Sequence, residues 1–450
     1  MTAFLIVLIF IVFAALMISR KVPAILAVPA MAILIAAAAG TPLRTILDGV
    51  IKDGAVRLAE AYLMVFAGAM LGRVVIQTGI AEGFIKRAAE FGGDRPLAVA
   101  ITLMAAIALL FTTLFGLGAV IMVGGLALPI MLSLGVPRRL TAVLFLLAFA
   151  LGLIFNIANW GFYQKALNLD PQTIRVFASV LAVIDALAIG VFLFIASRRM
   201  KRYGAWAVKI EEEEPAARPS VPLIALAVPL IPLILHLGLG WTALVKVGGL
   251  LGLSAQIESM PELLRTLLQS WNVIPAFLAG AVIGALIVRP REIVQQLSSA
   301  SVRGLEDVAP AIILMIGIGM LLNATTLPAV RGALEPFIAS INFRSPLVYI
   351  LFFGLLSPLS LYRGPLNPYG IGIGVYTLIS TLGLLPPQAL LAAALSVAQV
   401  QSACDPTNTQ NVWVANYVGI RVEEITRETI FYKMAVCVAG LVAGSLMYLR

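Results

Sequence analysis

Apolar residues fill most of this chain in long runs, which short polar segments separate. A helical run of about 20 apolar residues is long enough to cross a bilayer. The 450 residues are 61% hydrophobic, more than a soluble protein of this length could shield from water. The pattern therefore predicts an all-α polytopic membrane protein. The candidate spans are residues 4–18, 22–39, 59–77, 97–134, 142–155 and 176–196 in the first half, and 221–237, 273–287, 309–322, 347–385, 389–400 and 432–448 in the second.

Two of these runs are too long for one helix and are interrupted near the middle. Residues 97–134 contain TTLFGLG at 112–118, and residues 347–385 contain YRGPLNPYGIG at 362–372. We interpret each run as a re-entrant hairpin, at 96–136 and 346–386, which enters and leaves the membrane on the same side. This interpretation places most basic loops on one face, which the positive-inside rule makes cytoplasmic.

The two halves of the chain share one order of elements. Each contains five spans and one hairpin, so an odd number of spans inverts the second half relative to the first. At a shift of 250 residues, Gly54 corresponds to Gly304 and Met70 to Met320. We therefore predict a first inverted repeat at 1–197, a cytoplasmic linker at 198–220 and a second repeat at 221–450. Inverted repeats with interrupted helices are typical of secondary transporters.

A polar segment interrupts one helix in each repeat. The first is FNIANWGFYQ at 155–164, within a broken helix at 139–170. The second is SACDPTNTQNVW at 402–413, within a broken helix at 388–418. Non-helical backbone inside a membrane persists only where it lines a cavity or binds something. We expect both breaks and both hairpin tips to meet near the midplane of the bilayer.

The second break contains the residue types that bind a cation. Unwound carbonyls and neutral side-chain oxygens suit a small cation, and Asp405 adds one formal charge. A buried aspartate without a partner tends to hold a proton, whereas a bound sodium ion would keep it ionised. The alternative is that Asp405 is an ordinary N-cap of the second half-helix. The predicted coupling-ion residues are Asn156, Asp405, Thr407, Asn408 and Thr409.

The hairpin tips and the first break contain the candidate substrate residues. A guanidinium such as that of Arg363 is expensive at membrane depth unless it meets an anion, and its planar fork fits a carboxylate. The alternative is that Arg363 reaches the outer interface. Asp185, a further acid in a membrane helix, could serve as a proton site or as a structural partner. The predicted substrate-binding residues are Thr112, Thr113, Gly116, Gly118, Asn159, Trp160, Arg363, Gly364 and Asn367.

Charge and composition exclude several other classes. The net charge of +9 comes from basic residues in short loops, so it does not indicate nucleic-acid binding. One histidine and two cysteines offer no metal-site spacing, and no cofactor is expected beyond a bound sodium ion or a transported proton. We find no nucleophile–base arrangement typical of an enzyme. The predicted location is a bacterial-type cytoplasmic (inner) membrane, in contact with lipid.

Two segments resemble the gluconate:proton symporters of the GntP family. GAMLGRVVIQTGIAEGFIKRAAEFGG, at 68–93, is similar to the family's GAMLG segment. CDPTNTQNVWVANYVGIRVEEITRE, at 404–428, is similar to its C-terminal region, with matches at Asp405, Pro406, Trp413 and the Glu428–Thr429 pair. The resemblance implies a carrier of organic anions in the ion transporter superfamily, forming homodimers and working by an elevator mechanism. Both the first break and the second tip depart from the family pattern, so gluconate itself is not the expected substrate.

The leading hypothesis is therefore uptake of a small organic anion, a carboxylate, coupled to protons or sodium. The first alternative is an exporter or a cation/proton antiporter that uses the same site. A channel is less favoured, because channels are generally built from symmetric subunits around one axis.

Overall fold

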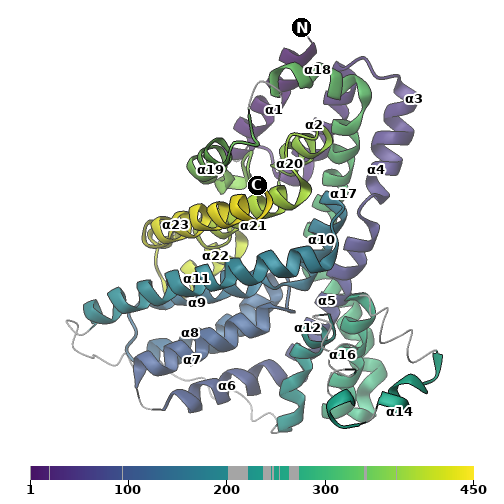
Figure 1. Cartoon of the computed structure of the whole chain (residues 1–450). Coiled ribbons are helices and arrows are strands. Elements are labelled where there is room, and N and C mark those ends of the chain that lie inside the picture. Colours follow the sequence, from purple (N-terminus) through teal and green to yellow (C-terminus); the bar gives the residue numbers. More distant parts are fainter. Residues whose placement is uncertain are drawn as a thin grey trace.

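The computed structural model describes residues 2–19, 21–93, 95–200, 221–236, 245, 248–252, 254–262, 273–338, 342–370 and 372–449, and these form helices joined by short connections (Figure 1). The predicted linker at 198–220 lies outside the described residues from 201 onward. The first half contains α1 (Thr2–Ile18), α2 (Ala24–Ala38), α3 (Leu43–Thr45), η1 (Ile46–Lys52), α4 (Asp53–Val56), α5 (Ala59–Gln77), α6 (Ile80–Gly92), α7 (Pro96–Phe111), α8 (Leu117–Ser133), α9 (Arg138–Ile154), α10 (Ile157–Leu167) and α11 (Pro171–Met200).

The second half repeats this order of helices. Its elements are η2 (Leu223–Leu230), α12 (Ile231–His236), α14 (Ser254–Glu258), α16 (Val273–Val288), η3 (Pro290–Glu292), α17 (Ile293–Thr326), α18 (Pro328–Ile338), α19 (Pro346–Leu355), η4 (Ser357–Arg363), α20 (Gly372–Thr381), α21 (Pro387–Cys404), α22 (Thr409–Val418) and α23 (Val422–Tyr448). From α16 onward, most of these helices begin within two residues of a first-half counterpart shifted by 250. Prolines open the helices at matching points, as Pro96 does in α7 and Pro346 in α19, because proline fits the first helical turn.

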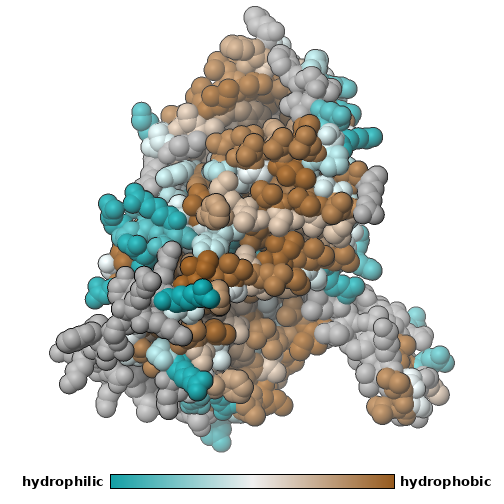
Figure 2. All heavy atoms as spheres, turned by 60° about the vertical axis from the view of Figure 1, so that its left-hand side comes forward, coloured by the Kyte–Doolittle hydropathy of each residue, from teal (hydrophilic) through white to brown (hydrophobic). Residues whose placement is uncertain are grey.

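Several stretches are long and apolar enough to span a membrane. Among the described residues, five qualify by length and composition: Leu43–Gln77, Pro171–Arg198, Pro290–Thr326, Pro346–Arg363 and Val422–Tyr448. A sixth is added if α9 and α10, which are bent by 50° at their break, count as one span. Apolar side chains cover much of the surface between the hydrophilic patches (Figure 2). This is the surface of an integral membrane protein, so the predicted all-helical membrane class is confirmed.

The broken helices form the centre of the molecule. In α9, every residue from 141 to 150 is buried, and in α21 every residue from 389 to 404 is buried. A helix that is apolar on all sides needs other helices around it. α11 and α23 pack beside α9 and α21 and expose outer faces such as Val183 and Leu187 (Figure 1).

The long helices α5 and α17 make a reciprocal contact. Gly54, just before α5, lies so close to α17 that a Cβ there would be 2.7 Å from the Cα of Met320. Gly304 lies so close to α5 that its Cβ would be 3.0 Å from the backbone nitrogen of Met70. These partners exchange places under the 250-residue shift. The early part of each segment therefore meets the late part of the other, as in an antiparallel pair related by a two-fold axis.

Polar contacts repeat the same exchange. Arg57 donates to the side-chain oxygen of Asn323 at 2.6 Å, while Arg73 forms a two-point ion pair with Asp307 at 2.5 Å. Positions 57 and 73 of the first half correspond to 307 and 323 of the second. The boundaries of the two repeats stay a prediction, which this reciprocity supports.

Candidate functional site

A cavity of about 810 Å³ lies where the helix interruptions meet. All four predicted interruptions contribute to its wall. The predicted site residues that line it are Gly116 and Gly118 from the first hairpin tip, Asn159 from the start of α10, Arg363 from the second tip, and Asn408 and Thr409 from the second break.

The first tip and the first break are braced together by Asn156. Its side-chain nitrogen donates to the carbonyl oxygens of Phe111 and Leu114, at 2.9 and 3.0 Å. Its side-chain oxygen accepts from the backbone N–H of Asn159, which makes Asn156 the N-cap of α10. Asn156 thus uses both ends of its amide inside the protein and does not line the cavity.

Three further polar residues of these two interruptions donate hydrogen bonds to nearby backbone carbonyls. The hydroxyls of Thr112 and Thr113 donate to the carbonyls of Leu109 and Leu110. The indole of Trp160 donates to the carbonyl of Ile154 at 2.8 Å and closes the end of α9. None of the three lines the cavity, so their predicted contact with substrate is not what the geometry favours.

The second tip has an unusual backbone. Tyr362 and Arg363 have φ angles of 56° and 55°, two consecutive non-glycine residues in the left-handed region. Each such residue costs about 1–3 kcal/mol, and such strain clusters at functional sites. Asn367 holds the tip by donating to the carbonyl of Ser360 and accepting from the backbone N–H of Tyr369. Gly364 lies against the carbonyl of Leu359, where a Cβ would clash.

This backbone directs Arg363 to the cavity. The described part of the chain gives its guanidinium one hydrogen bond, to the carbonyl of Tyr369 at 3.4 Å, and no ion pair. The side chain is partly buried. Asp405 lies within electrostatic range of Arg363. Arg363 therefore lines the cavity, while its depth in the bilayer stays a prediction.

The second break is held by its own side chains. Asp405 ends α21, and its Oδ1 accepts from the backbone and the hydroxyl of Thr407, at 2.8 and 2.6 Å. Asn408 is the N-cap of α22 and exchanges two hydrogen bonds with Gln401, each at 2.9 Å. The interpretation of Asp405 as the N-cap of the second half-helix is wrong, because α22 begins four residues later, at Thr409, and its N-cap is Asn408.

Two buried oxygens in this break have no hydrogen-bond partner. They are the second carboxylate oxygen of Asp405 and the side-chain oxygen of Asn411, whose nitrogen donates to the backbone carbonyl of Asp405. Both residues are at most 1% exposed. A buried polar atom without a partner is costly and requires an explanation such as a bound ion. Neither Asp405 nor Asn411 lines the cavity itself, whereas Asn408, Thr409 and Gln410 between them do.

Sequence reasoning missed several cavity residues. Gln399, Gln401 and Ser402 line the cavity from the last turns of α21, just before the break. Tyr163 and Tyr369 add aromatic rings, with centroids 6.1 Å apart. Arg73 and Asp307 line another part of the wall, with the Asp307 carboxylate against Gly118 of the first tip. The sequence signal for Arg73 was a charged residue within the apolar run at 59–77, whereas Asp307 lies just before the run at 309–322 and gave no such signal.

Asp185 has a partner, Lys433, whose ammonium lies 2.7 and 2.9 Å from its two carboxylate oxygens.

The described residues do not form a cluster of the kind that holds a transition metal. Within the described ranges, no three His, Cys, Asp or Glu side chains gather in one place.

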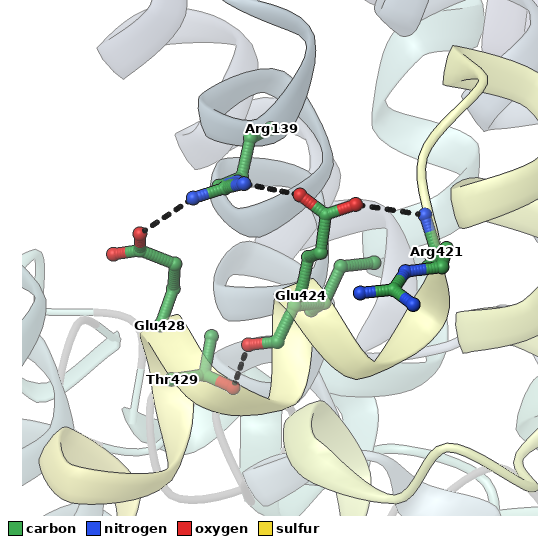
Figure 3. Close-up of polar contacts among 6 residues, drawn as sticks. Arg139, Arg421, Glu424, Glu428 and Thr429 are labelled. Carbon is green, nitrogen blue, oxygen red and sulfur yellow. Dashed lines mark hydrogen bonds and ion pairs between the residues drawn. The ribbon is translucent and has the colours of Figure 1, made fainter.

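Glu428 and Thr429 connect the C-terminal helix, α23, to neighbouring helices. Arg139 of α9 reaches between Glu424 and Glu428 on α23 (Figure 3). Thr429 donates to the carbonyl of Ile425 and lies 3.2 Å from the sulfur of Cys404. These two residues therefore join α23 to α9 and α21 rather than lining the cavity.

The described residues thus form an all-helical membrane fold with a cavity at its helix breaks. The crystal structure of the YdaH transporter of Alcanivorax borkumensis, described as having an unusual topology, is similar to this chain. The match has a TM-score of 0.55 and 15% identity, and covers 89% of this chain and 87% of that one.

The other comparisons found no relative. No model of a known protein family matches the chain, and no curated protein does. Structural similarity to a membrane transporter is thus shown, while membership of the gluconate:proton symporters is not.

Proposed function

We propose that this protein is a secondary active transporter that takes up a small organic anion, a carboxylate, together with protons or sodium. The observation that carries the proposal is the strained second tip, which directs Arg363 to the cavity without giving it a carboxylate partner. A guanidinium in that position is matched by an anion with two coplanar oxygens. The transporter fold of the similar structure supports the same class.

The second break is the proposed site of the coupling ion. Asp405 and Asn411 supply the unpartnered oxygens, and Thr407, Asn408 and Thr409 surround them in the chain. An ion bound there would lie within electrostatic range of Arg363, since Asp405 does. Binding of the ion and of the anion would therefore be coupled, because each charge stabilises the other.

The proposed movement is of the elevator type. α5 and α17, locked by their reciprocal backbone contacts, would form the fixed part. The hairpins and broken helices would carry the cavity past them. A homodimer in a bacterial-type inner membrane remains part of the proposal.

A thermal-shift screen of the purified protein tests the function directly. The ligands are a panel of organic acids at fixed ionic strength, each with sodium and with choline as the cation. We expect at least one carboxylate to raise the melting temperature of the wild type but not of Arg363→Gln. Failure of every acid in the panel would contradict anion transport. Stabilisation by sodium alone would favour the cation/proton antiporter.

A further inference from the structure

One ion pair is buried away from the proposed ion site. Lys433 of α23 binds both carboxylate oxygens of Asp185 on α11, and it also donates to the side-chain oxygen of Gln399 on α21 at 3.2 Å. The side chains of Lys433 and Asp185 are 1% and 0% exposed. Three helices therefore meet at one fully enclosed ammonium group.

The pair lies at mid-depth of two membrane spans. Lys433 is the twelfth of the 27 residues of Val422–Tyr448, and Asp185 is the fifteenth of the 28 residues of Pro171–Arg198. The opposite face of α11, with Val183 and Leu187, is exposed. Ionisable residues at this depth are costly and mark ion pathways more often than packing sites. A hydrophobic pair of similar volume would hold two helices together at least as well.

Gln399 connects the pair to the cavity. It is one of the residues that line the cavity, and its side-chain oxygen is the third ligand of the Lys433 ammonium. No other side chain separates Lys433 from that lining residue. The four-carbon side chain of lysine is flexible, so the Lys433 ammonium could move toward the cavity once its ion pair with Asp185 is broken.

The surroundings of the pair contain few other titratable groups. Cys404, at the end of α21, lies within electrostatic range of Lys433, Asp185 and Asp405. On the far side, Tyr432 of α23 and Leu147 of α9 line the small space beside the pair. One turn further along α23, Cys437 faces Tyr349 of α19. Among the described residues, the Lys433 ammonium contacts one carboxylate, that of Asp185, and one amide oxygen, that of Gln399.

We infer that the Asp185–Lys433 pair is the proton-binding site of the carrier, and that protonation of Asp185 releases the Lys433 ammonium to bind the transported anion. The inference rests on the proposed uptake function. It adds a second cation to the cavity beside Arg363, and it assigns the proton a place distinct from the oxygens at Asp405.

The exchange balances in charge. In the resting pair, the carboxylate and the ammonium cancel. A proton from the outer solution adds to an oxygen of Asp185, the ion pair breaks, and Lys433 keeps its three protons. The pair then carries one positive charge, which an incoming monocarboxylate neutralises. A neutral loaded site crosses a low-dielectric region more easily than a charged one.

Infrared difference spectroscopy of the full-length protein in lipid tests the proton site without any substrate. Ordinary Asp and Glu side chains are ionised throughout the range from about pH 8 to about pH 6, because their pKa values lie near 4. We expect acidification over that range to produce a protonated-carboxyl band. The band should be lost in Asp185→Asn, shifted in frequency in Asp185→Glu and kept in Asp405→Asn. A band that survives Asp185→Asn, or no band in the folded wild type, overturns the inference.

Anion binding at two pH values tests the coupling. The probes are acetate, succinate, citrate and benzoate, in thermal-shift titrations at about pH 6 and about pH 8. We expect the responding acid to bind the wild type about tenfold more tightly at the lower pH. Asp185→Asn should bind equally at both values, and Lys433→Gln should bind weakly at both. Retained pH dependence in folded Asp185→Asn contradicts the coupling.

The two experiments separate the two proposals. If no probe binds the wild type at either pH, anion transport by this site fails, and the infrared band still decides whether Asp185 takes a proton. If a probe binds but the band is missing, the uptake function stands and this inference falls. The double variant Asp185→Asn/Lys433→Gln, which buries no unpaired charge, keeps the test valid if either single variant misfolds.

Discussion

The two helix breaks occupy matching places in the chain but treat their polar groups differently. At the first break, the Asn156 amide bonds two carbonyls of the hairpin tip and one backbone N–H of α10. At the second, Asp405 keeps one oxygen without a partner and Asn411 keeps another. The first break is neutral, whereas the second carries a formal charge.

This difference indicates that the two helix breaks have different roles. At the first break, the asparagine that caps the second half-helix is fully hydrogen-bonded within the protein and holds the first hairpin in place. A break with buried unpartnered oxygens is less stable by itself and gains most from a ligand. Substitutions at the first break should therefore change stability, and substitutions at the second should change binding.

The largest effect on ligand binding is expected for Asp405→Asn. Loss of the charge removes the strongest ligand of the proposed ion, so ion-dependent anion binding should fall by about a hundredfold, equivalent to ~3 kcal/mol. Thermal-shift titration and uptake into proteoliposomes measure this loss. The melting temperature without ligand should stay the same or rise, because an unpaired buried charge has gone. Asp170→Asn, which removes an exposed aspartate bonded to Thr173, is the matched control. Unchanged coupling in Asp405→Asn would refute the ion site.

Substitutions of Arg363 separate the contribution of its charge to anion binding from that of its planar guanidinium. Arg363→Lys keeps the charge but loses the planar fork, so anion affinity should fall by about tenfold, and Arg363→Gln should lose more. Titration of the acid found in the screen gives both values. Arg344→Gln is the control, since Arg344 lies two residues before the same hairpin, is exposed and donates to the carbonyl of Gly383 near the hairpin's other end. Equal loss in the control would show that the hairpin fold, not the anion contact, was affected.

Asn156→Ala should lower stability without changing ion dependence. It leaves the buried carbonyls of Phe111 and Leu114 without a donor, at a cost of about 2–4 kcal/mol in the free energy of unfolding. Thermal unfolding measures the loss. Asn411→Ala, at the other break, removes a single hydrogen bond along with the unpartnered oxygen and should cost about 1 kcal/mol. A reversed order of the two costs would remove the distinction between the breaks.

A substitution at the first tip is expected to lower stability modestly. A Cβ on Gly118 would lie 2.5 Å from an oxygen of Asp307, so Gly118→Ala should displace that carboxylate from Arg73 and cost about 1–2 kcal/mol. Gly125→Ala, on the same helix and with open space around its Cβ position, should instead gain up to about 1 kcal/mol from helix propensity. Thermal unfolding compares the two variants. A stabilised Gly118→Ala would show that the tip is not held against Asp307.

Much of the fold was predictable because hydrophobic pattern and proline position act locally. The interruptions at 112–118 and 362–372 divide helices where expected, and the broken helices end at Ile154 and Cys404. The helix boundaries of the two halves also correspond at the shift of 250 residues that the sequence suggested. Both halves are built to cross the same bilayer, so their element lengths are under the same constraint.

The site was less predictable because hydrogen bonding depends on neighbours far away in the chain. Asn156 and Asn408 are both asparagines next to a break, yet only Asn408 lines the cavity. The partner of Asp185 comes from a helix 248 residues later, which a single sequence cannot indicate. Gln399 was hidden for another reason, since one polar residue in an apolar helix resembles ordinary packing.

The reciprocal glycines have a mechanical consequence. Gly54 and Met70 are 16 residues apart, which corresponds to about 24 Å along a helix. Two close backbone contacts at that separation prevent α5 and α17 both from sliding along each other and from rotating relative to each other. The proposed elevator movement would then take place in the short connections that join α5 and α17 to the other helices.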